Sequence, residues 1–120
     1  MTNIVVHEVN EVADEVFLGK VIRDGKVAVL YAPGFGAGWS TWASECDREI
    51  TFDPVIVGYV EHEKWDELAS YMAMRYPTVY TGGMHDLTIA WVKEGSLFRI
   101  TEYDGSEGIE FKENDGWMTA

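Results

Sequence analysis

The chain has 120 residues, of which 47% are hydrophobic and 25% charged, and its formal net charge is -12. This length and composition predict one globular domain over residues 1–120 that buries a core without metals or disulfides, and they exclude a disordered chain. The excess of 21 acidic over 9 basic residues argues against direct binding to nucleic acid, which needs Lys and Arg to displace counterions.

Cysteine usage and hydropathy indicate the compartment. The single cysteine, Cys46, excludes an intramolecular disulfide framework and favours a reducing cytoplasm, where we expect an unreactive, half-buried thiol. No apolar run approaches the roughly 20 residues that span a bilayer, so no membrane segment is expected. Residues 1–15 are acidic and lack the basic start of a signal peptide.

The first third of the chain has the patterns of β-strands. Alternation begins a strand at residues 4–8, and Val16–Ile22 and Lys26–Tyr31 are apolar-rich. Asp24-Gly25 separates the latter two, and this pair favours a tight hairpin because both central residues need positive φ. We therefore predict that the two runs are antiparallel neighbours, and that the unbroken apolar run 27–31 is buried on both faces.

A glycine-rich loop follows that strand, and the rest of the chain is expected to be organised around it. The loop lacks the lysine of a phosphate-binding P-loop, and Trp39 stands where a dinucleotide fingerprint needs its last glycine. It is either a structural corner or a site where backbone N–H groups bind a small anion and aromatic rings stack on it. The candidate ligand-binding residues are Tyr31, Gly34, Gly36, Gly38, Trp39, Thr41, Trp42, Tyr80 and Arg99.

Two helices are predicted in the middle of the chain. Asp53 followed by Pro54 is a helix start, so the first helix covers about 53–61. The second covers about 63–76, where apolar residues recur at steps of three and four until Pro77 ends the helix. We interpret that apolar stripe as core.

Three strands are predicted at the carboxy-terminal end, over 86–92, 97–103 and 107–112, with a second hairpin at Asp104-Gly105. The predicted fold class is therefore α+β: an antiparallel sheet of about five to six strands with both helices packed on one face.

Carboxylates gather in the last two predicted strands. They form either a solvated edge that prevents sheet-to-sheet pairing or a surface that docks on a partner. Arg99 is expected to pair with one of them across the strands. A metal-dependent enzyme using Asp86, Glu102 and Asp104 is a further alternative. The candidate partner-binding residues are Glu102, Asp104, Glu107 and Glu110.

No complete catalytic motif is present, which favours a binding protein over an enzyme. Ser40 lacks the second glycine of the G-x-S-x-G nucleophile elbow, and its expected role is to cap a turn. The histidines His7, His62 and His85 are scattered, so no zinc or iron site and no cofactor is expected.

Three segments together resemble a group of small uncharacterised proteins of tailed phages and prophages. They read YAPGFGAGWSTW from Tyr31, YTGG from Tyr80 and FRITEYDGSE from Phe98. The resemblance covers most of the chain from Val21 on. It implies an intracellular phage product in a bacterial cytoplasm and assigns no catalytic residue.

Two functional hypotheses follow. The first is a phage accessory protein whose acidic surface binds a bacterial host or defence protein, for example one that itself binds nucleic acid, to inhibit or redirect it. The second is a small-ligand or nucleotide-binding protein that uses the Gly34–Gly38 loop and its flanking aromatics. The oligomeric state stays open, since free strand edges would also allow a homodimer.

Overall fold

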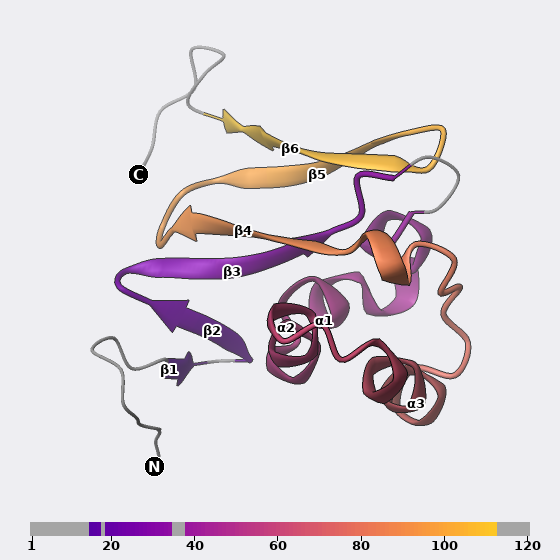
Figure 1. Cartoon of the computed structure of the whole chain (residues 1–120). Helices are drawn as coiled ribbons and strands as arrows, with labels where there is room; N and C mark the ends of the chain where they lie inside the picture. The colour runs from indigo at the N-terminus through magenta and orange to yellow at the C-terminus, as the bar shows by residue number, and fades with distance from the viewer. Residues whose placement is uncertain (1–14, 18, 35–37, 113–120) are drawn as a thin grey trace.

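A computed structural model describes residues 15–17, 19–34 and 38–112 (Figure 1). Its strands are β1 (Glu15–Phe17), β2 (Lys20–Arg23), β3 (Lys26–Tyr31), β4 (Thr88–Lys93), β5 (Phe98–Tyr103) and β6 (Ser106–Phe111). Its helices are α1 (Asp47–Phe52), α2 (Pro54–Glu61) and α3 (Trp65–Arg75), with 3-10 turns η1 (Ser40–Trp42), η2 (Ser44–Cys46) and η3 (Met84–Asp86). The predicted α+β class is confirmed. The expected strand at residues 4–8 lies outside the described residues.

Two antiparallel sheets replace the one that was expected. The first has the order β1-β2-β3-β4, and the second is the β5–β6 hairpin. Both Asp-Gly hairpins are confirmed: Asp24 and Gly25 have φ of 53° and 76°, and Asp104 and Gly105 have φ of 56° and 83°. Positive φ at both central residues is the geometry of a type I′ turn, whose twist matches that of the flanking strands.

Strand β3 is the centre of the fold and is buried on both faces, as predicted. Ala28 and Leu30 lie in the larger core cluster with the helices. Val27 and Val29 lie in a second cluster, together with apolar side chains of the β5–β6 hairpin. The hairpin therefore packs on the opposite face of the first sheet from the helical core, because alternate residues of a strand point to opposite faces.

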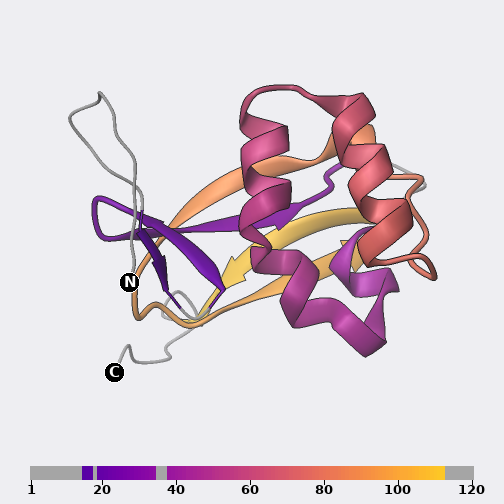
Figure 2. The same ribbon diagram turned by 90° about the horizontal axis from the view of Figure 1, so that it is seen from below.

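The two predicted helices are confirmed with slightly shorter bounds, and Figure 2 shows α2 and α3 side by side over the sheet. Most of the predicted α3 stripe is core, since Leu68 and Met72 are fully buried and Tyr76 is buried, whereas Ala69 is exposed. Helix α1 was not predicted, because its six residues are too few to show a helical period.

Two strand bounds were wrong. The run Val16–Ile22 is not one strand: β1 ends at Phe17, and Gly19, with φ of 75°, precedes β2. The strand expected from Asp86 begins only at Thr88, because residues 84–86 form η3. Among the described residues, no helix is long and apolar enough to cross a membrane.

Candidate functional site

The glycine loop is held by a buried carboxylate from β6. Glu107 is only 3% exposed. Its Oε1 accepts a hydrogen bond from the Ala32 N–H at 3.0 Å, and its Oε2 accepts one from the Trp39 N–H at 2.7 Å. The N–H and hydroxyl of Thr41 also donate to Oε2, at 3.0 and 2.5 Å. One carboxylate thus joins both ends of the loop to the hairpin.

This geometry changes how the loop is interpreted. The residues that flank the loop present backbone N–H groups to a carboxylate, and that carboxylate is the protein's own Glu107. Because these donors are occupied, an external ligand cannot use the N–H groups of Trp39 and Thr41. Glu107 was expected on an accessible acidic surface; that placement is wrong, because the side chain is buried.

A sequence signal for this burial exists. Glu107 shares the alternation of Ile109 and Phe111, which both pack into the core cluster under the hairpin. A period of two therefore places Glu107 on the inward face of β6. Its donors lie 66 to 75 residues earlier in the chain, and no local pattern identifies them.

Several candidate ligand residues are structural. Trp39 is fully buried and its indole N–H donates to the Ile50 carbonyl at 3.1 Å, so the proposal that it stacks on a ligand is wrong. Tyr31 is half-buried and pairs with Thr88 in the sheet. Gly36 lies outside the described residues.

Glycines allow neighbouring side chains to pack closely. A Cβ on Gly38 would lie 2.7 Å from Cδ1 of Trp42, and one on Gly82 would collide with the Tyr80 ring. A Cβ on Gly34 would collide with the Asp86 carboxylate. At these positions a side chain would displace a neighbour, so the glycines serve as close-packing positions.

Two of the predicted aromatics form an exposed pair. Trp42 is 46% exposed and Tyr80 is 54% exposed, and their ring centroids lie 5.6 Å apart. Because Trp42 lies on Gly38 and Tyr80 on Gly82, the pair is positioned by the backbone beneath it.

The β5–β6 turn lies at the same end of the molecule, as Figure 1 shows. The hydroxyl of Ser106 donates to the Pro33 carbonyl at 2.6 Å, which fixes the turn beside the glycine loop. At the turn, Glu102 and Asp104 are exposed and Tyr103 is 78% exposed. The carboxylate of Glu102 accepts a hydrogen bond from the Gly105 N–H at 2.7 Å, so its position is fixed as well. We name this surface the loop end: Trp42, Tyr80, Glu102, Tyr103 and Asp104.

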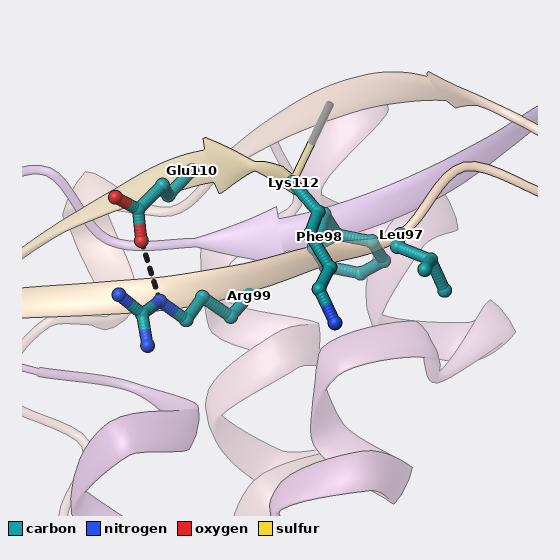
Figure 3. A pocket seen from close by; sticks show the side chains of 5 residues that line it. All are labelled: Leu97, Phe98, Arg99, Glu110 and Lys112. Atoms are coloured by element: carbon teal, nitrogen blue, oxygen red, sulfur yellow. Dashed lines mark hydrogen bonds and ion pairs between the residues drawn. The ribbon is translucent and has the colours of Figure 1, made fainter. Parts of the chain in front are cut away.

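Arg99 pairs across the hairpin, as predicted. Its Nε donates to Oε1 of Glu110 at 2.5 Å, and the two residues are register partners. Figure 3 shows both side chains at a hollow of about 320 Å³ that Leu97, Phe98 and Lys112 also line. Arg99 and Thr41 additionally line one groove between β5 and η1, so the structure brings these two candidates together.

Asp53 forms a second buried polar cluster. Its Oδ1 accepts hydrogen bonds from the N–H groups of Val55 and Ile56, which caps α2 as predicted. Its Oδ2 accepts hydrogen bonds from the hydroxyls of Tyr71 and Tyr76, at 2.8 and 2.7 Å. Burial, and then the hydrogen bond to Asp53, raises the pKa of Tyr71 to about 12, and the same causes raise the pKa of Tyr76 further.

These pKa shifts predict a loss of stability in alkali. Between the ordinary tyrosine pKa near 10 and the raised pKa of Tyr71, the folded state binds more protons than the unfolded state. The free energy of unfolding therefore falls as the pH rises from about 10 to 12. Urea unfolding at pH 9 and pH 11 measures the fall, and absorbance at 295 nm reports when phenols ionise. The Tyr71→Phe and Tyr76→Phe variants should lose part of this dependence; ionisation of every tyrosine near pH 10 without unfolding would contradict the expectation.

The lone cysteine is not activated. Burial, followed by the nearby Glu45 carboxylate, raises the pKa of the half-buried Cys46 thiol. The thiolate is the nucleophilic form, so this environment disfavours covalent catalysis at Cys46.

No candidate metal site is found in the part of the chain that the structure describes. That part holds no group of three or more His, Cys, Asp or Glu side chains placed to bind an ion. Asp86, Glu102 and Asp104 therefore do not converge as the metal-dependent alternative requires. Comparisons with protein-family models, with curated proteins and with solved structures find no match for this chain.

Proposed function

We propose that this protein is a non-enzymatic binding protein whose loop end docks on a basic surface of a protein partner. The observation that carries the proposal is the Trp42–Tyr80 pair, two large rings held exposed on close-packed glycines. Tryptophan and tyrosine are the side chains that most often dominate binding energy at protein interfaces. Rings positioned in advance lose little conformational entropy when a partner covers them.

Charge supports a basic partner. The chain carries a net charge of -12, and the carboxylates Glu102 and Asp104 are exposed at the β5–β6 turn, at the same end of the molecule (Figure 1). An acidic rim accelerates encounter with a basic surface and disfavours acidic ones. The small-ligand alternative at the glycine loop has weaker support, because Trp39 is fully buried and the N–H groups of Ala32, Trp39 and Thr41, which flank the loop, already donate to Glu107.

The resemblance to phage proteins supplies the biological context of the proposal. In that context the protein is a tailed-phage product in the bacterial cytoplasm, and its partner is a host or defence protein that it inhibits or redirects. A partner that itself binds nucleic acid has the basic surface that the loop end requires.

Site-specific photocrosslinking tests the proposal. A photoreactive phenylalanine analogue at position 80 or 103 is expected to capture the partner in host cells, whereas the same analogue at Met74 is not. Met74 is a matched control because it is 76% exposed and lies on α3. With the captured partner purified, Trp42→Ala and Tyr80→Ala should each weaken binding by roughly 30-fold, the effect of an interface hot spot of about 2 kcal/mol.

Two results would contradict the docking proposal. One is equal loss of affinity in Met74→Ala, which would place the interface elsewhere or show unspecific adhesion. The other is affinity that does not fall as salt is raised, since an acidic rim on a basic partner makes association salt-sensitive.

A further inference from the structure

The few basic residues of this acidic protein are not evenly spread. Four of the nine, Lys20, Arg48, Arg75 and Arg99, line two grooves on either side of Phe52. One groove, of about 590 Å³, runs from Gly19 past α1 to the end of α3. The other, of about 510 Å³, lies between α1, η1 and β5. We name the pair the α1 grooves; each has the size of a small-ligand site.

Two of these cations belong to both grooves and are available to a ligand. Lys20 and Arg48 line both, and the Lys20 ammonium lies 4.7 Å from the Phe52 ring centroid. Across residues 19–34 and 38–112, the Arg48 side chain is exposed and has no hydrogen bond or ion pair. Arg99 is bound by Glu110, and Arg75 lies over the Tyr76 ring at 4.6 Å.

In the described part of the chain, no carboxylate that lines the α1 grooves forms an ion pair with Lys20 or Arg48. Asp53 is buried, and its two oxygens already accept four hydrogen bonds. Asp47 lines one groove and Glu49 the other, both exposed on α1. Two cations therefore line both grooves without an ion pair to any described carboxylate, in a protein whose net charge is -12.

The walls of the α1 grooves are partly apolar. The rings of Phe52 and Phe98 meet edge to face, with centroids 6.2 Å apart, and both line the groove beside β5. Apolar walls with a few cations are typical of sites that bind an organic anion.

From this arrangement we infer that the α1 grooves bind the phosphate groups of a small organic ligand, with Lys20 and Arg48 as the direct contacts. Arginine suits the role because its planar guanidinium matches two phosphate oxygens, and lysine adds a point charge. A long nucleic acid is a poor occupant, since the acidic remainder of the surface repels a polyanion. The site is separate from the loop end, so either assignment can fail without the other.

Titration of the full chain with pyrophosphate and with ADP, followed by backbone amide NMR at constant ionic strength, tests the inference. Shifts are expected at residues 19–20, 48–52 and 96–99, and ADP is expected to bind more tightly than pyrophosphate because its organic part meets the phenylalanine walls. Arg48→Gln and Lys20→Gln should each weaken binding by roughly tenfold, as expected for a lost hydrogen bond to a charged group. Arg48→Lys should recover part of the loss.

Lys64→Gln is the matched control, because it removes one positive charge from an exposed side chain just before α3. It should leave the affinity within a factor of two of the wild type, as expected for a charge screened by solvent. Equal weakening by Lys64→Gln, or no shift in the three segments at millimolar probe, would overturn the inference. Equal affinities for ADP and pyrophosphate would overturn the role of the apolar walls. The titration and the photocrosslinking experiment probe different surfaces. A failure to capture a partner at the loop end would therefore not change the outcome of the ADP and pyrophosphate titrations.

Discussion

Replacing Glu107 with alanine is expected to lower the free energy of unfolding by about 4 kcal/mol, more than any other single substitution proposed for this protein. The change leaves the N–H groups of Ala32, Trp39 and Thr41 without their acceptor. Each buried donor that loses its partner costs about 1–3 kcal/mol, and the cavity left by the side chain adds to the loss. Since small domains have stabilities of roughly 5–15 kcal/mol, the variant should be marginally folded.

Urea unfolding measures the effect of the Glu107 substitutions. Glu107→Gln keeps the shape and one acceptor oxygen, but its amide N–H groups face other donors, so a loss of about 2 kcal/mol is expected. Glu110→Gln is the control on the same strand: its partner Arg99 is largely exposed, and the loss should stay below about 1 kcal/mol. Equal midpoints for Glu107→Ala and Glu110→Gln would show that the carboxylate does not hold the loop.

Replacing Asp53 with alanine is the second large effect, with an expected loss of about 3 kcal/mol. About 1 kcal/mol comes from the missing N-cap of α2, where Val55 and Ile56 lose their acceptor. The rest comes from the hydroxyls of Tyr71 and Tyr76, which lose the hydrogen bonds that join α3 to the start of α2.

Two comparisons separate these contributions of Asp53. Asp53→Asn keeps a good N-cap, so it should lose only about 1–2 kcal/mol, from the weaker hydrogen bonds to the hydroxyls. In the double-mutant cycle with Tyr76→Phe, the two losses should be less than additive by about 1 kcal/mol, because both remove the same bond. Asp66→Ala, an exposed acidic residue in the first turn of α3, is the control and should cost about 0.5 kcal/mol. Additive losses would exclude a direct interaction between Asp53 and Tyr76.

Features set by neighbouring residues could be predicted from the sequence alone. The two Asp-Gly turns, the Asp53-Pro54 helix start and the apolar stripe of α3 each depend on contacts within a few residues. The double burial of β3 follows from an uninterrupted apolar run, and the pairing of Arg99 with a carboxylate follows from hairpin register. Turn chemistry, capping and periodicity act over these short separations.

Contacts between residues far apart in the sequence were revealed only by the tertiary structure. The sequence left open whether the glycine loop is a structural corner or an anion site, and only the packing of β6 beside the end of β3 brings the Glu107 carboxylate to the N–H of Ala32, 75 residues earlier in the chain. The packing of the β5–β6 hairpin on the second face of the sheet is also visible only in the tertiary structure. So is the groove that brings together Lys20, Arg48 and Arg99 from three separate elements. Local sequence patterns indicate which face of a helix or strand is apolar or charged. Which other element that face contacts depends on how all the elements pack around the core.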